Sequence, residues 1–173
     1  MLLNEREERH NTVLQAAKLI MSAARTAPKA RGVDLIEIAV VEGDDLKRLS
    51  DATLQMYERT GRPVYQRDAA NILQGEAVLL IGTCRQVMGL NCAHCGYATC
   101  GEKPENVPCA INTTDVGIAI GSACATAADL RIDTRVLFSA GMGAMLADFL
   151  PGCTDVFAIA LSASSKNPFF DRK

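Results

Sequence analysis

The stretch from residue 114 to residue 130, TDVGIAIGSACATAADL, is the strongest indication of the fold. It has almost no large polar side chain, so the helix that it predicts must be covered by the rest of the protein. Small or apolar residues recur on nearly every side of the helix that it predicts: Val116, Gly117, Ile118, Ala119, Ile120, Gly121, Ala123, Cys124, Ala127 and Ala128. Such a helix should be covered all round, either at the centre of the domain or across a subunit interface. The four-residue spacing of Gly117, Gly121 and Ala125 would let another backbone approach closely, so we expect a homodimer.

Four apolar runs around this helix predict the strands of a sheet, at residues 35–41, 77–81, 136–138 and 156–161. Periodic apolar positions predict further helices over 4–25, from 43 to about 61, and over 68–73, with a short helix starting at Gly141-Met142-Gly143. We therefore expect a single α/β (α+β) domain over residues 1–173, with a mixed sheet of about four strands packed against helices.

Composition narrows the function classes. The chain has 173 residues, 49% of them hydrophobic and 22% charged, and a net charge of -2. No basic field is available to attract nucleic acid or an anionic membrane. Charged residues occupy positions 5–9, where a signal peptide would be apolar, and no apolar run is long enough to span a bilayer, so we expect a cytoplasmic protein. With only His10 and His94 in the chain, hydrolytic chemistry with a histidine base is disfavoured.

The segment 84–110 is rich in Gly, Cys and Pro and has neither helical nor strand periodicity, so we interpret it as an insert organised by metal. Four of the seven cysteines fall between residues 92 and 109, in the pattern Cys92-x2-Cys95-x4-Cys100-x8-Cys109. One short loop can wrap four such thiolates around an iron-sulfur cluster of the 4Fe-4S type. Zinc also takes four cysteines and remains the alternative. We expect Gly89, Gly96 and Gly101 to allow the wrapping through positive φ.

The remaining thiols and the loop histidine are left outside the predicted site. Cys84, Cys124 and Cys153 lie in apolar or turn settings, where cysteine behaves as a small hydrophobic residue. His94 stands between the first two cysteines and could replace one of them as a ligand, but we interpret it as an exposed loop residue.

The stretch 91–100, NCAHCGYATC, resembles the Cys-Gly-x-Cys-Gly-x-x-x-Cys signature of the 4Fe-4S domain in corrinoid iron-sulfur proteins and in an electron-transport complex subunit. The resemblance covers only this loop. It departs from the signature at Ala93, where glycine is usual, and in the short spacing to Cys109, the least certain of the four ligands.

Two other stretches resemble the nitroreductase family. Residues 23–29, AARTAPK, are similar to the Ala-Arg-x-Ala-Pro-Ser stretch that ends an early helix there, and 115–120, DVGIAI, is similar to the central helix. The whole arrangement, with a cysteine loop between strand and central helix, is similar to a prokaryotic family of uncharacterised ferredoxin-domain-containing proteins. The nitroreductase resemblance implies that FMN binds between two subunits.

The residues that would hold FMN depart from the nitroreductase pattern. Lys29 stands where the family has a flavin-contacting serine, and the family's phosphate arginines have no clear counterparts. Arg6, Arg9 and Arg172 could hold the phosphate by charge, with Lys173 beside them, and Gly141 and Gly143 could offer backbone amides. We expect FMN to bind weakly or not at all.

The sequence thus predicts an iron-sulfur protein that passes single electrons on a nitroreductase-like scaffold, in a flavin-linked or flavin-free form, to an unknown redox partner. The alternative is a non-catalytic interaction or structural module in which zinc staples the loop.

Overall fold

The computed structural model describes residues 1–170, and its core is a four-stranded sheet. The strands are β1 (Ile36–Val41), β2 (Ala77–Cys84), β3 (Asp133–Leu137) and β4 (Cys153–Ser162), in the order β1-β2-β4-β3. The α/β class and the four strands confirm the expectation from the sequence.

All three strand pairings are antiparallel, whereas a mixed sheet was expected. The helix pair between β1 and β2 returns the chain to the end where it left the sheet, so these neighbours run in opposite directions. β2 and β3 run in the same direction and are joined by one long helix, but β4 lies between them. The sheet therefore has no parallel neighbours, although the chain contains a parallel-type crossover.

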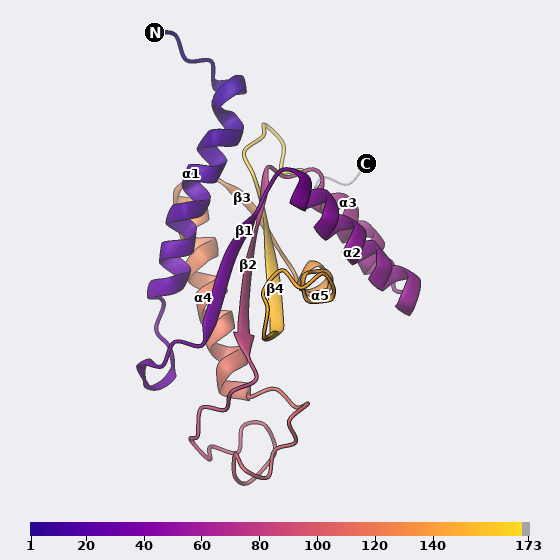
Figure 1. Ribbon diagram of the computed structural model, residues 1–173. Helices are drawn as coiled ribbons and strands as arrows, with labels where there is room; N and C mark the ends of the chain where they lie inside the picture. Colours follow the sequence, from indigo (N-terminus) through magenta and orange to yellow (C-terminus); the bar gives the residue numbers. More distant parts are fainter. Residues whose placement is uncertain (171–173) are drawn as a thin grey trace.

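Helices cover both faces of the sheet (Figure 1). α1 (Glu5–Thr26) and α4 (Ala110–Asp129) lie on one face, and α2 (Asp44–Thr60), α3 (Pro63–Ile72) and α5 (Phe138–Leu146) lie on the other. Leu79 and Ile81 of β2 pack against the first pair, while Val78 and Leu80 pack against the second group. β2 reads as a continuous apolar run because neither of its faces meets water.

Two helix ends follow local signals in the sequence. The Asn4 side chain caps α1 by accepting from the Arg6 backbone N–H at 3.0 Å. Gly61 ends α2 in the left-handed conformation, with φ at 66°. α4 begins at Ala110, before the expected residue 114, so Cys109 occupies its N-cap position.

Within the chain α4 is buried on one face only, so it does not lie at the centre of the domain, and the alternative expectation, cover by a second subunit, stays a prediction. Its inner residues contact α1 and the sheet: Val116, Ala119, Ala123 and Ala127. Gly117, Gly121 and Ala125 are exposed, and Ile118 is 41% exposed. In the part of the chain that the structure describes, α4 thus presents a small, weakly polar face to solvent.

None of the helices among residues 1–170 is both long and apolar enough to span a membrane.

Candidate functional site

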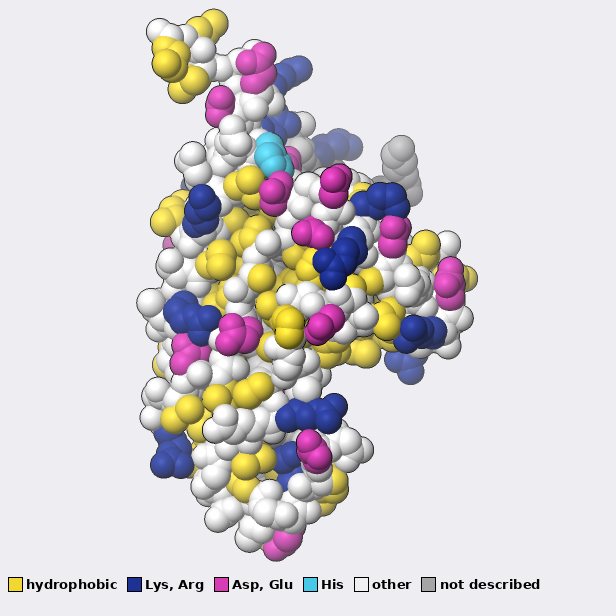
Figure 2. All heavy atoms as spheres, in the orientation of Figure 1, with side chains coloured by type: hydrophobic (Ala, Val, Ile, Leu, Met, Phe, Trp, Pro, Cys, Tyr) yellow, Lys and Arg dark blue, Asp and Glu magenta, His cyan; other side chains and the backbone are white. Residues whose placement is uncertain are grey.

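The cysteine-rich segment joins β2 to α4 and protrudes at the end of the molecule opposite the N-terminus (Figures 1 and 2). Two hydrogen bonds attach its first part to the body. The Arg31 guanidinium donates to the Met88 carbonyl at 3.2 Å, and the Asn112 amide on α4 donates to the Gln86 carbonyl. The segment thus leaves the sheet at a defined point, and its tip projects into solvent.

Backbone turns shape the loop around its first two cysteines. Gly89 and Gly96 have positive φ, as expected, whereas Gly101 is not among the positive-φ residues of the structure. Ala93 also lies in the left-handed region, with φ at 57°, and the Gly96 N–H donates to its carbonyl at 2.9 Å. A residue with a Cβ is strained there, and glycine would relieve that strain.

Asn91 and Cys100 hold each other across the loop. The Cys100 backbone N–H donates to Asn91 Oδ1 at 2.8 Å, and the Asn91 backbone N–H points at Cys100 Sγ at 3.4 Å. Backbone N–H groups directed at cysteine sulfurs stabilise negative charge on thiolate ligands. The sequence did not predict this role of Asn91, because no local pattern indicates a hydrogen bond between residues nine positions apart.

Cys109 lies at the N-terminus of α4, where several amide groups converge on its sulfur. Burial would raise the pKa of this thiol, but hydrogen bonds from the backbone of Met88, Asn112 and Ile111, with the charge of Lys103, outweigh it and hold the pKa below its usual value. The sequence left Cys109 as the least certain ligand. Its surroundings favour the thiolate form that metals bind.

The structure does not bring the four thiols together as a set. All four cysteines are free; Cys92 is exposed, and Cys95, Cys100 and Cys109 are partly buried. Within residues 1–170, no three His, Cys, Asp or Glu side chains are grouped closely enough to hold a metal ion. Without a cation, little holds neighbouring thiols together, and the free energy of metal binding normally closes such loops. The donor set fits an iron-sulfur cluster or zinc by its chemistry, and the loop would have to tighten on binding.

Comparison with known proteins gives the chain a family, through a model that matches its C-terminal part and a relative that matches its whole length. The model of a family described as "Uncharacterized protein containing a ferredoxin domain (DUF2148)" matches residues 105–172. An uncharacterized protein of Archaeoglobus fulgidus is 37% identical over 182 residues, covering 99% of this chain and 98% of its own. The chain belongs to this ferredoxin-domain family.

Solved structures with the same fold include proteins described as nitroreductases or nitroreductase-like, at identities that show the fold alone. B. megaterium NfrA2 aligns with a TM-score of 0.58 and 17% identity over 88% of this chain, which spans only 58% of NfrA2. A nitroreductase-like family protein from Bacillus cereus gives 0.59 and 12% over 92% of this chain and 79% of its own. An FMN-dependent nitroreductase from Clostridium difficile gives 0.57 and 15% over 88% and 76%. The expected nitroreductase-like fold is confirmed.

The flavin residues predicted for this ferredoxin-domain protein do not form one site in the chain. Arg6 and Arg9 lie on α1, whereas Gly141 and Gly143 lie on α5, across the sheet. Arg9 pairs with Glu5 at 2.8 Å. Arg172 lies outside the described residues. The Lys29 ammonium donates hydrogen bonds to the Ala24 carbonyl at 3.1 Å and to the Arg25 carbonyl, so Lys29 caps the end of α1.

Gly141 and Gly143 are packing residues inside α5 rather than an anion cradle at its start, which corrects the sequence-based interpretation. A Cβ on Gly141 would lie 1.8 Å from the Val156 carbonyl oxygen of β4, and one on Gly143 would lie 2.8 Å from the Thr53 backbone nitrogen of α2. Both glycines let α5 contact its neighbours backbone to backbone. Their amides are turned into the helix, and FMN does not fit the contacts that these residues make.

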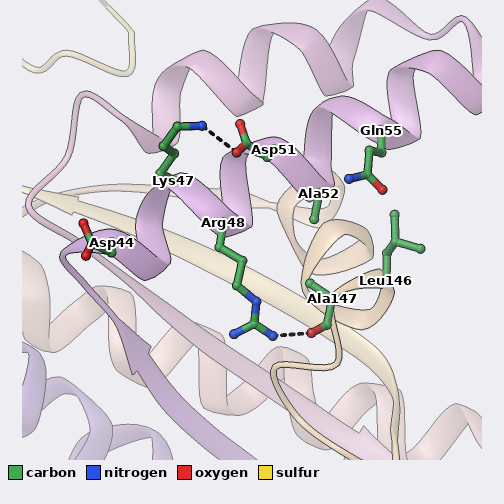
Figure 3. Close-up of a pocket in the computed structure, with 8 residues that line it drawn as sticks. All are labelled: Asp44, Lys47, Arg48, Asp51, Ala52, Gln55, Leu146 and Ala147. Atoms are coloured by element: carbon green, nitrogen blue, oxygen red, sulfur yellow. Dashed lines mark hydrogen bonds and ion pairs between the residues drawn. The ribbon is translucent and has the colours of Figure 1, made fainter.

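A surface depression of about 500 Å³ lies between α2 and the end of α5 (Figure 3). Three of its charged side chains have partners: Lys47 pairs with Asp51 at 2.6 Å, and Arg48 donates to the Ala147 carbonyl at 2.6 Å. Arg48 also lies over the Phe149 ring, 4.2 Å from its centroid. None of the lining residues belongs to the cysteine-rich segment.

Proposed function

We propose that Cys92, Cys95, Cys100 and Cys109 ligate an iron-sulfur cluster of the 4Fe-4S type, and that the protein transfers single electrons. The observation that carries the proposal is that four free cysteines lie between residues 92 and 109 of one protruding segment, with the Asn91 backbone N–H directed at Cys100 Sγ. The ferredoxin domain in the description of its family supports it. When bound, such a cluster accepts and releases one electron at a potential set by its surroundings.

The residues of this chain would do three things for such a cluster. The four thiolates would hold the iron. The amides around Cys100 and Cys109 would offset the negative charge that each added electron brings. The protruding position of the loop would let a protein partner approach closely enough for electron transfer, and that partner is unknown.

A tightly held flavin is not part of the proposal. The nitroreductase relatives share the fold, and one of them is described as FMN-dependent. In this chain Lys29 donates to a carbonyl of α1, and Arg9 pairs with a glutamate of α1. Gly141 and Gly143 pack against the backbones of β4 and α2. We expect FMN affinity to be weak, and titration of the purified protein with FMN, followed by fluorescence quenching, measures it.

We further propose a homodimer in which the exposed face of α4 packs against its copy. Gly117, Gly121 and Ala125 lie on this face and would let two backbones approach closely. Ile118 lies on the same exposed side and would supply apolar contact.

Anaerobic purification followed by metal and sulfide analysis tests the cluster. We expect iron and acid-labile sulfide in equal molar amounts, with an absorbance band at about 400 nm that decreases on reduction. Cys109→Ser should lose most of the iron, whereas Cys124→Ser, a matched change on α4 outside the loop, should retain it. Stoichiometric zinc without sulfide would replace the proposal with the zinc-stapled module. A protein with neither metal would refute both.

A further inference from the structure

Cys84 and Cys153 face each other across the sheet, outside the four-cysteine set. Cys84 is the last residue of β2, and Cys153 is the first residue of β4. They are direct cross-strand partners in the antiparallel ladder. In a regular antiparallel pair, directly opposed residues have Cα atoms about 4.5 to 5.5 Å apart, inside the range that a disulfide requires, and the two thiols here are close enough for Cys84 to raise the pKa of Cys153.

A β-bulge creates this pairing. Thr83 pairs with Asp155, and the register then shifts so that Cys153, in place of Thr154, lies opposite Cys84. The Cys153 side chain consequently packs with the apolar cluster on the α2 and α5 face. Leu80 of β2 packs on the same face, and Cys84 follows it with the same alternation. Both thiols therefore lie on one side of the sheet.

The space around the pair is kept open by a glycine. A Cβ on Gly82 would lie 3.2 Å from both the Cβ and the Sγ of Cys153 and 2.9 Å from Val156 Cγ2. Any larger residue at position 82 would press on the Cys153 side chain. Both cysteines are partly exposed, so a small oxidant can reach them.

From this geometry we infer that Cys84 and Cys153 form a reversible dithiol–disulfide couple at the base of the cysteine-rich segment. The segment starts directly after Cys84, so the disulfide would tie its first residue covalently to the start of β4. The inference goes beyond the proposed function, because it holds whether the loop binds iron, zinc or no metal.

The oxidation balances with a small-molecule disulfide as the oxidant. The Cys84 thiolate attacks one sulfur of that disulfide, forms a mixed disulfide and releases one thiolate. Cys153 then loses its proton, and its sulfur attacks Cys84 Sγ and displaces the second thiolate. Two protein thiols lose two electrons and two protons, and the oxidant becomes two thiols. Burial, the charge of Glu37 and the neighbouring Cys84 raise the pKa of Cys153 to about 11, so this thiol is mostly protonated at neutral pH and the first attack is assigned to Cys84.

Peptide mapping of the full-length protein tests the couple. Anaerobically purified protein is incubated with oxidised glutathione, its free thiols are blocked with N-ethylmaleimide, and it is digested with trypsin without reduction. Cys84 is released in peptide 68–85 and Cys153 in peptide 136–166, and each peptide contains a single cysteine. We expect these two peptides to be linked, with a mass two hydrogens below their sum, and to separate on treatment with dithiothreitol.

Variants and a second measurement complete the test. Cys84→Ser and Cys153→Ser should each abolish the linked peptide, and Cys124→Ser should retain it. The oxidised wild-type protein should melt about 5 °C or more above the identically treated Cys84→Ser variant. If both cysteines still react with N-ethylmaleimide after oxidation, the inference is overturned. It is also overturned if Cys84 or Cys153 forms its disulfide with a cysteine of peptide 86–131. The wild-type map decides the matter even if a variant folds poorly.

Discussion

The backbone N–H of Ala30 donates to both carboxylate oxygens of Asp115, at 3.1 Å each, although 85 positions separate the two residues. Ala30 follows the stretch that ends α1, and Asp115 lies in the first turns of α4. The two stretches that resemble nitroreductases are therefore held together by one buried carboxylate. A second bond joins α1 itself to α4, from the Ser122 hydroxyl to the Ala23 carbonyl at 2.8 Å.

Replacement of Asp115 should destabilise the whole domain. Asp115 is 5% exposed, and loss of its charge-assisted hydrogen bonds should cost about 1 kcal/mol in Asp115→Asn and about 2 kcal/mol in Asp115→Ala. Urea denaturation measures the loss, and Asp129→Asn at the exposed end of the same helix serves as the control. Equal midpoints for Asp115→Ala and Asp129→Asn would show that the carboxylate does not hold the segment after α1 to α4.

Relief of the strain at Ala93 should strengthen metal retention. A Cβ in the left-handed region costs roughly 1 kcal/mol, and we expect this turn to persist when the loop tightens on the metal, so Ala93→Gly should lose metal to a chelator several-fold more slowly than the wild type. Ala98→Gly is the matched control in the same loop, because Ala98 is not among the positive-φ residues of the structure. A faster loss from Ala93→Gly than from the wild type would contradict this conformation of the loop.

Gly141→Ala should be among the most damaging single-methyl changes in the chain. The new Cβ would lie 1.8 Å from the Val156 carbonyl oxygen, so α5 must shift off β4, and we expect a loss of about 3 kcal/mol or more. Gly101→Ala is the control, since its Cβ would meet nothing within 4 Å. Thermal unfolding compares the two variants with the wild type, and a mild Gly141→Ala phenotype would disprove the close approach.

The α4 interface should be sensitive to one large charge. Light scattering at micromolar concentration should give a dimeric mass for the wild-type protein and a monomeric mass for Gly121→Arg, because the side chain would stand between the two backbones. Gln55→Arg on exposed α2 should leave the dimer intact. A monomeric wild type would refute the interface.

The Cys153 thiol should react slowly and with a steep dependence on pH. With its pKa raised to about 11, chiefly by burial, iodoacetamide should modify it roughly 100-fold more slowly at pH 8 than an unperturbed thiol. The rate should rise about tenfold per pH unit up to pH 10. Since the unfolded chain releases this proton near its ordinary pKa of 9.0, the contribution of Cys153 to stability falls as pH rises from about 9 to about 11.

Removal of the Glu37 charge provides the control for this titration. Glu37→Gln should lower the pKa of Cys153 and accelerate its alkylation at pH 8, because a carboxylate near the thiol opposes thiolate formation. Mass spectrometry of peptide 136–166 follows the rate. A flat rate between pH 8 and pH 10 would show that Cys153 is not desolvated as the structure places it.

The local sequence determined most of the helices and strands of this protein, along with the cysteine pattern. The buried strands followed from apolar runs such as Ala77–Cys84, and two helix ends followed from Asn4 and Gly61. The candidate ligands followed from their spacing, because Cys92 to Cys109 fall within one uninterrupted loop. These features depend on interactions over a few positions, which periodicity and spacing record directly.

Only the tertiary structure decided which segments meet. The insertion of β4 between β2 and β3 made every pairing antiparallel, and no local pattern encodes that order. Gly141-Met142-Gly143 has the sequence of an anion-binding turn, but in the fold Gly141 packs directly against the Val156 carbonyl. Cys84 and Cys153 resembled separate small hydrophobic residues until a bulge placed them opposite each other. Such contacts join residues far apart in the chain, so they depend on the packing of the whole domain, which a stretch of sequence does not contain.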